Sequence, residues 1–552
     1  MTGAAFDRTT SLRRLADETF DVLVIGGGIT GAGVALDAAS RGLRVALVER
    51  GDFASGTSSK SSKLVHGGLR YLQQKEYRLV YENLHERQRL LENAPHLVIP
   101  LPFLIPLFGR SGGVNKTVAK AYRTALWLYD ITGGLRIGKR HKKVSKAEAL
   151  HHLPTLNTDL LAAAFLYYDA QADDARLTLT LLRTAADHGA VIANHAPVVE
   201  VTKDERGAQV TGAVLSDGTV VRAKCVVNAT GVWADDVRAL AEGEHPDSIR
   251  PAKGIHITVP AAKLPCDIAA VVPVPKDRRS IFVVPWGSHT YLGTTDTDYT
   301  GDRDRPECTQ DDVRYVLEAI NRFITSPLTE DDVTGTWAGL RPLVKNEDKA
   351  RTADLSRRHK VLVSEEGLVT ITGGKLTTYR KMAQDAVDAV GAQLDRKLKR
   401  NHTTSMKVRG ADGLDHLRRE GGDRLGLDDE TFQHLVSRYG TDTRTVSAMV
   451  AADPTLGEPL VPKLPYLRAE ALYAARYEMA HTLEDVLSRR TRALLLERDG
   501  AAAAAGDVAR LIASELGWDE DEQQRQVDAF VAIADRERIA AQTMPAEPAR
   551  TV

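Results

Sequence analysis

The stretch that decides the fold is Asp21-Val-Leu-Val-Ile-Gly-Gly-Gly-Ile-Thr-Gly31, close to the start of the chain. Its first part is a short apolar run rich in β-branched residues, which is typical of a buried parallel strand. Gly26, Gly28 and Gly31 then have the G-x-G-x-x-G spacing of a dinucleotide-binding turn. The first glycine allows a tight turn, the second lets the backbone approach a pyrophosphate, and the third lets the next helix pack against the strand. That helix is expected over residues 30–41, with its N-terminal amides facing the pyrophosphate.

A second strand is expected over residues 44–49, and it ends in a carboxylate. Glu49 lies 18 residues after Gly31, where the acid that binds the ribose of a dinucleotide is expected. A glycine triplet alone is weak evidence, because glycines also occur in ordinary turns. The order of strand, turn, helix, strand and acid favours a nucleotide site, but it does not distinguish FAD from NAD.

The composition limits the class of protein. A length of 552 residues suggests two or three domains. With 73 Lys+Arg and 74 Asp+Glu, the net charge gives no indication of nucleic-acid binding. The three cysteines, Cys225, Cys266 and Cys308, lack the spacing of a redox dithiol or a metal site, so electron chemistry would need a cofactor and no metal is expected. The apolar residues 22–39 are interrupted by five glycines and Asp37, which makes them a poor membrane span. A cytoplasmic protein is expected.

A longer motif connects the turn to a family. Residues 57–72, Thr-Ser-Ser-Lys-Ser-Ser-Lys-Leu-Val-His-Gly-Gly-Leu-Arg-Tyr-Leu, closely resemble the segment that follows the second strand in FAD-dependent glycerol-3-phosphate dehydrogenases. A polar surface loop would explain the serines but not the whole string. In that family the segment wraps the flavin and carries part of the substrate site. The resemblance implies cofactor contacts for Thr57, Ser58 and Ser62, and substrate contacts for Arg70 and Tyr71. Residues 224–231 resemble the second FAD-contacting turn of the fold, which implies a cofactor contact for Gly231.

Two motifs in the second half complete the expected site. Residues 339–343 are Gly-Leu-Arg-Pro-Leu, and residues 373–380 are Gly-Gly-Lys-Leu-Thr-Thr-Tyr-Arg. A glycine pair that opens a helix provides an anion site. In the family this turn meets the pyrimidine edge of the flavin, which implies cofactor contacts for Gly373, Gly374, Leu376 and Thr377. The resemblance also implies that Arg341, Arg357 and Lys375 bind the phosphate of glycerol 3-phosphate or polarise its C2–O bond.

The base that accepts the hydroxyl proton of the substrate has two candidates. His66 and His256 are the two histidines that lie in family motifs, and a histidine with a pKa near neutrality is a natural proton acceptor. A single histidine in a strand pattern, such as residues 254–259, is often structural. We expect both to lie in or near the pocket, and His66 is the preferred base.

The resemblance covers residues 21–518 or so and implies an α/β fold in three parts. The first is a discontinuous, Rossmann-like FAD-binding domain of the glutathione-reductase/D-amino-acid-oxidase type (residues 17–95, 175–235 and 335–385). The second is a substrate domain with an antiparallel sheet (96–174 and 236–334), which includes a hairpin of residues 280–285 and 290–294. The third is a helical domain (386–552). There, residues 482–485 form a capping box for an amphipathic helix expected to end near Gly500, with residues 501–505 as a helical or loose connector.

The expected activity is oxidation of sn-glycerol 3-phosphate to dihydroxyacetone phosphate, with hydride transfer to FAD and electrons passed to a membrane quinone. The alternatives are an oxidase that uses oxygen and a non-catalytic FAD-binding sensor. Residues 138–146, Gly-Lys-Arg-His-Lys-Lys-Val-Ser-Lys, form a basic run. It is either a solvated loop or a contact with anionic lipid at the inner face of the cell membrane. A homodimer is expected.

Overall fold

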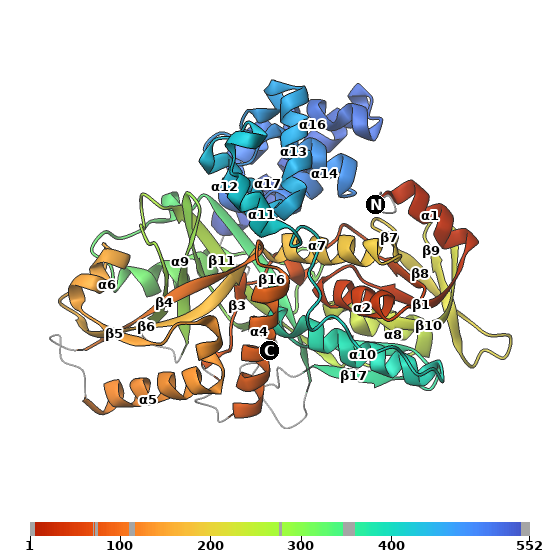
Figure 1. The fold of residues 1–552 in the computed structure, drawn as a ribbon, viewed down its shortest axis with the longest axis horizontal. Coiled ribbons are helices and arrows are strands. Elements are labelled where there is room, and N and C mark those ends of the chain that lie inside the picture. Colours follow the sequence, from red (N-terminus) through yellow and green to blue (C-terminus); the bar gives the residue numbers. More distant parts are fainter. Residues whose placement is uncertain are drawn as a thin grey trace, which may run out of the picture.

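The computed structural model describes residues 6–69, 71, 76–109, 116–274, 279–345 and 359–542. Two sheets lie side by side, and the C-terminal helices, drawn in blue, gather on one side of the junction between them (Figure 1). Residues from both sheets and from the C-terminal helices meet at this junction.

Within the described residues, eight strands form the first sheet, whose central order is β17-β18-β10-β1-β2-β7. Strands β1, β2, β7, β10 and β18 run parallel, and the glycine turn follows β1 as predicted. Helices α2 and α10 pack on each other, and α7 packs on α2. The bounds are β1 Thr19–Ile25, α2 Ile29–Ser40, β2 Val45–Val48, α7 Asp174–Asp187, β7 Val191–Ala193, β8 Val198–Lys203, β9 Val210–Leu215, β10 Val220–Asn228, β17 Lys360–Val363, β18 Val369–Thr372 and α10 Tyr379–Gln393.

The second sheet has ten strands in the same described ranges, in the order β15-β11-β14-β13-β12-β4-β6-β3, with β16 beside β11 and β5 beside β6. Its pairing is antiparallel apart from β12 with β4, and the predicted hairpin is β13–β14. The bounds are β3 Leu64–Val65, β4 Val98–Phe108, β5 Lys142–Val144, β6 Leu161–Ala172, β11 Ile249–Pro260, β12 Ala269–Pro273, β13 Ser280–Trp286, β14 His289–Gly293, β15 Thr297–Asp298 and β16 Gly335–Val344.

Strand β16 shows where the division of the chain into domains is less simple than the sequence suggests. The predicted boundaries place residues 335–344 in the nucleotide-binding part, whereas β16 pairs with β11 along its whole length, from Ile249↔Val344 to Thr258↔Gly335. It nevertheless packs closely against the segment of residues 57–63. A Cβ added to Gly339 would lie only 2.5 Å from the carbonyl oxygen of Lys60. The domain boundaries therefore stay a prediction.

The C-terminal part is helical, but one predicted helix is wrong. The capping contacts exist, since the Asp485 amide donates to Thr482 Oγ1 (3.1 Å) and the Thr482 amide to Asp485 Oδ2 (3.1 Å). They open only a short π-helix, η11 (Asp485–Arg490), followed by extended backbone at Thr491. Gly500 and residues 501–505 then lie inside a new helix, α16. The break turns three buried arginines towards carboxylates of the FAD-binding part, as described below.

The remaining helices are α1 Arg8–Asp17, α4 Tyr77–Asn93, α5 Lys116–Thr132, α6 Lys146–His152, α8 Ala234–Glu242, α9 Gln310–Asn321, α11 Leu414–Glu420, α12 Asp429–Tyr439, α13 Thr443–Ala452, α14 Arg468–Tyr477, α15 Ala493–Leu496, α16 Arg498–Leu516 and α17 Glu520–Gln542.

Candidate active site

A cavity of about 580 Å³ lies where the first sheet, the second sheet and the C-terminal helices meet. The residues that line it come from segments far apart in the sequence. They include most of the predicted cofactor contacts: Gly26, Gly28, Glu49, Thr57, Ser58, Gly231, Gly373, Gly374 and Leu376. The fold therefore brings together groups that the sequence could connect only through family motifs.

The glycine turn has the geometry of a nucleotide cradle. Gly26 has a φ of +112°, and a Cβ there would lie 2.7 Å from the carbonyl oxygen of Ala229. A Cβ on Gly31 would lie 1.9 Å from the carbonyl oxygen of Gly26, so α2 can pack this closely only without a side chain. The Ile29 amide, at the start of α2, donates to Ser58 Oγ (2.8 Å). Polar groups are thus held at a helix N-terminus, where a pyrophosphate is favoured.

Glu49 ends β2 at the edge of the same cavity. Its carboxylate accepts hydrogen bonds from the amides of Gly27 (2.7 Å) and Gly51 (2.9 Å). Burial raises the pKa of Glu49, against the effect of these two bonds. The acid is therefore fixed beside the turn, in the position expected of a ribose ligand. The close-packed glycines, the helix N-terminus and this acid all fit FAD.

The turn at residues 373–378 meets the segment that carries His66. The His66 amide donates to Thr377 Oγ1 (3.1 Å), and the Lys375 ammonium lies 4.1 Å from the centre of the Tyr71 ring. The Lys375 Nζ is buried, and Lys375 also lines the cavity. Gly374, with a φ of +92°, leaves room for Met382, whose sulfur would be 2.1 Å from an added Cβ. Three predicted substrate or catalytic residues, His66, Tyr71 and Lys375, are thus gathered at one place.

Arg341 approaches from β16 and is held by the loop after β14. Its guanidinium donates to Asp296 Oδ1 (3.2 Å) and to Thr294 Oγ1 (3.3 Å), and the side chain is 26% exposed. Gly254 on β11 makes room for it, because a Cβ there would lie 2.6 Å from Arg341 Nη2. Arg70 and Arg357, also predicted to bind substrate, lie outside the described residues.

His256 occupies a different environment from His66. It is 2% exposed, its ring stacks on Trp337 (centroids 4.7 Å apart, 11° between planes), and its Nε2 lies 2.9 Å from Ser62 Oγ. Burial, and then the charges of Lys63 and Arg341, hold the pKa of His256 well below its ordinary value. Such a histidine is a poor proton acceptor near neutral pH. His256 is therefore fixed against Ser62 and Trp337, and the preference for His66 as the base stays a prediction.

Two family models and several known proteins match this chain. A family model described as FAD dependent oxidoreductase matches residues 21–380, and one described as the C-terminal domain of alpha-glycerophosphate oxidase matches residues 401–523. Glycerol-3-phosphate dehydrogenase 2 of Mycobacterium tuberculosis is 42% identical over 548 residues, which cover 98% of this chain and 92% of that protein. The mitochondrial glycerol-3-phosphate dehydrogenase of Homo sapiens is 39% identical over 92% of this chain and 72% of its own length.

The chain belongs to the glycerol-3-phosphate dehydrogenase family of FAD-dependent oxidoreductases. A solved structure agrees: the glycerol-3-phosphate dehydrogenase from Bacillus halodurans, complexed with FAD, has a TM-score of 0.77 and 32% identity, with 97% of each chain covered. The predicted family, fold class and FAD cofactor are confirmed.

In this member of the family, the FAD-binding loops are held by buried arginines that the sequence analysis did not assign. Arg492 donates to Asp174 Oδ1 (2.6 Å) and to the Ser59 carbonyl oxygen (2.6 Å). Lys63 binds the same two partners at 3.1 and 3.0 Å. Burial, and then Arg492, lower the pKa of Lys63 to about 8. The string of residues 489–492, Arg-Arg-Thr-Arg, was the available signal, but the partners Asp52 and Asp174 lie more than 300 positions away.

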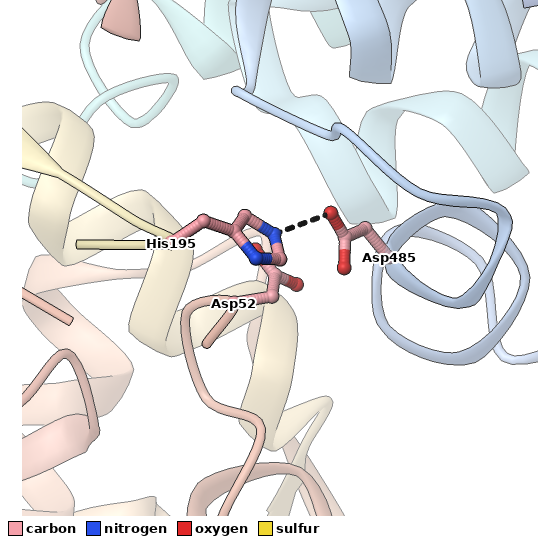
Figure 2. Close-up of side chains that lie close together, drawn as sticks. All are labelled: Asp52, His195 and Asp485. Carbon is pink, nitrogen blue, oxygen red and sulfur yellow. Dashed lines mark hydrogen bonds and ion pairs between the residues drawn. The ribbon is translucent and has the colours of Figure 1, made fainter. Parts of the chain in front are cut away.

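A second group joins the C-terminal domain to the loop after β2. Figure 2 shows His195 between Asp52 and Asp485, with its Nε2 3.0 Å from Asp485 Oδ2. The ligand atoms of these three residues lie within 4.8 Å of one another, a spacing that could hold a metal ion. Both carboxylates are already bound by guanidinium groups, however. Arg490 donates to both oxygens of Asp52 (2.6 and 2.8 Å), and Arg489 donates to Asp52 (2.6 Å) and Asp485 (2.7 Å). This is the arrangement of a buried ion-pair network between domains.

Removal of Asp52 should therefore destabilise the protein strongly. In Asp52→Ala, Arg490 would be left buried without a carboxylate partner and Arg489 would lose one of its partners; an unbalanced buried charge typically costs about 3–5 kcal/mol. We expect that loss in the free energy of unfolding, measured by denaturant titration. Asp412→Ala, at an exposed loop position, is the matched control and should change stability by less than about 0.5 kcal/mol. Equal effects in the two variants would contradict a structural role for the network.

Proposed function

We propose that this chain oxidises the C2 hydroxyl of sn-glycerol 3-phosphate, giving dihydroxyacetone phosphate, and passes the electrons to a membrane quinone. The observation that supports this most directly is the contact of His66 and Tyr71 with the turn at residues 373–378, whose Lys375 lines a cavity that fits FAD. When bound, FAD supplies the acceptor for a hydride. The chain's own residues must then hold the phosphate, orient C2 and accept the hydroxyl proton.

Each of these tasks has a candidate residue. The Arg341 guanidinium suits a phosphate or the substrate oxygen, because it offers a fixed fork of donors. Asp296 and Thr294 accept hydrogen bonds from this guanidinium and hold it in one orientation. Lys375 adds a cation on a turn that is fixed through Thr377 and His66. His66 is the candidate to accept the hydroxyl proton, and the stacked, buried His256 would help to keep the Ser62 loop in position.

The test is reduction of the purified yellow protein without oxygen. Glycerol 3-phosphate should bleach the flavin absorbance, whereas a non-catalytic FAD-binding sensor would keep its colour. A second measurement then compares a soluble quinone with oxygen as the oxidant of the bleached protein. Faster reoxidation by the quinone supports a dehydrogenase, and faster reoxidation by oxygen means that the chain is an oxidase.

We also propose peripheral contact with an anionic lipid surface. Among the described residues, no helix is long and apolar enough to cross a bilayer. Helix α5 instead exposes Trp127 (56%) and Ile131 (54%), one turn apart on the same face. Lys120 and Arg123 of the same helix are exposed, and so are four cations of the following basic run: Lys139, Arg140, Lys142 and Lys143. An apolar face with basic neighbours suits the interface of an anionic membrane.

Binding to anionic vesicles should therefore fall steeply as salt is added. Each Lys or Arg near the surface contributes about 1 kcal/mol, and this attraction is screened over about 8 Å at physiological ionic strength. Vesicle sedimentation across a salt series measures the effect. Replacement of Lys139, Arg140, Lys142 and Lys143 by glutamine should weaken binding at low salt and flatten the salt dependence. Unchanged binding in that variant would exclude the run from the contact. The location at the inner membrane face and the homodimer stay predictions.

A further inference from the structure

The last helix of the chain, α17 (Glu520–Gln542), forms part of the wall of the cofactor cavity. Ile533, Arg536 and Glu537 line the same cavity as the glycine turn after β1. Most of α17 lies beyond residue 523, where the match to the C-terminal family model ends. The contribution of α17 to the cavity is therefore a feature of the tertiary structure that the family motifs do not cover.

Two polar groups on this wall are buried without a hydrogen-bond partner among the described residues. One is Glu537 Oε2, and the other is Ser488 Oγ of the π-helix η11, a residue only 7% exposed. Both residues line the cavity. Leaving a buried polar group unsatisfied costs about 1–3 kcal/mol, so such groups commonly face a ligand or ordered water.

Glu537 faces charges from several elements. Lys60, Arg498 and Glu484 act electrostatically on its carboxyl group. Arg489 and Arg305 act in the same way on Lys60. Arg536 and the Cys308 thiol line the same cavity. Burial raises the pKa of Glu537 to about 8, and Lys60 and Arg498 oppose that effect. The carboxyl group is thus mainly neutral at pH 7 and ionises in mildly alkaline solution.

Lys60 connects Glu537 to the cofactor. It lies two residues after Ser58, whose hydroxyl accepts from the amide at the start of α2, where the pyrophosphate of FAD is expected. Lys60 lines the same cavity and interacts electrostatically with Glu537, so its ammonium would be shared between a cofactor phosphate and an ionised Glu537. An ionised Glu537 would therefore compete for Lys60 and would also repel the phosphates directly.

We propose that α17 is part of the FAD-binding site and that tight binding of FAD requires the neutral form of Glu537. The sign of the pH dependence follows. FAD favours the protonated carboxyl group, so its affinity is highest below pH 8 and falls as the pH rises through that value. Because like charges repel, ionisation of Glu537 should weaken the binding constant of FAD roughly tenfold.

The experiment measures the dissociation constant of FAD between pH 7 and 9.5, from the fluorescence of flavin released by the holoenzyme. In the wild type we expect affinity to fall roughly tenfold over this range. In Glu537→Gln, where no charge can develop, most of that fall should disappear. Asp528→Asn, which removes an exposed charge from the same helix, should behave like the wild type. Lys63 also titrates near pH 8, but its contribution is common to the three proteins and cancels in the comparison.

Three outcomes would overturn the proposal. The first is a wild type whose FAD affinity does not fall over this range, a result that needs no variant. The others are a Glu537→Gln profile parallel to that of the wild type, and an Asp528→Asn profile like that of Glu537→Gln. The inference rests on FAD as the cofactor and not on the substrate. A holoenzyme that releases FAD as described but is not bleached by glycerol 3-phosphate would contradict the proposed function alone.

Discussion

Gly31→Ala is expected to yield protein that binds no FAD and shows no flavin absorbance. The added Cβ would lie 1.9 Å from the Gly26 carbonyl oxygen and 3.1 Å from its carbonyl carbon, both of which are backbone atoms that cannot rotate away. Relief requires α2 to move off β1, which would open the turn that receives the pyrophosphate. The ratio of flavin absorbance to protein absorbance, measured after purification in excess FAD, reports the loss.

A glycine of α16 acts as a control for this effect. Gly506→Ala lies within α16, with its nearest neighbour at 3.7 Å, and should be neutral or stabilise the protein by about 0.5–1 kcal/mol. Normal flavin content in Gly31→Ala would mean that the turn is not the cofactor cradle.

Arg341→Ala is expected to slow anaerobic reduction of the flavin by about 10²–10³ at saturating glycerol 3-phosphate, while FAD stays bound. The reason is electrostatic: negative charge develops on the substrate oxygen as its hydroxyl proton leaves, and FAD, when bound, would take up the hydride from C2. A guanidinium fixed in advance by Asp296 and Thr294 stabilises that charge without having to reorient. Stopped-flow absorbance of the flavin measures the rate. Lys375→Ala should have a similar effect and should also make the oxidised flavin harder to reduce.

Arg250→Ala supplies a matched control for Arg341→Ala. Arg250 also lies in the second sheet and also pairs with an aspartate, Asp298, but that pair is more exposed and contributes little. Its removal should leave the reduction rate within about twofold of the wild type. If Arg341→Ala reduces its flavin at the wild-type rate once substrate is saturating, the arginine only binds phosphate, and a raised KM would be its sole effect.

The local geometry of the nucleotide-binding turn could be predicted from the sequence. The strand β1, the glycine turn, α2 and Glu49 follow from local rules. Apolar β-branched residues favour the buried strand, and only glycine fits the positive φ at residue 26 and the close contact at residue 31. The motif at residues 57–72 likewise led to the family. Such features can be predicted because the groups that decide them lie within a few tens of residues.

The contacts between segments far apart in the sequence became apparent only in the tertiary structure. Strand β16 belongs to the second sheet because its hydrogen bonds are made with β11, although its sequence motif suggests the nucleotide-binding part. The helix predicted up to Gly500 breaks into η11, α15 and α16, where the arginines at 489–492 bind carboxylates such as Asp52, 437 positions from Arg489. Glu537 likewise lines the cofactor cavity only because the chain folds α17 against it. The free energy of a buried charge depends on partners that only the folded chain brings near, so no local pattern encodes these contacts.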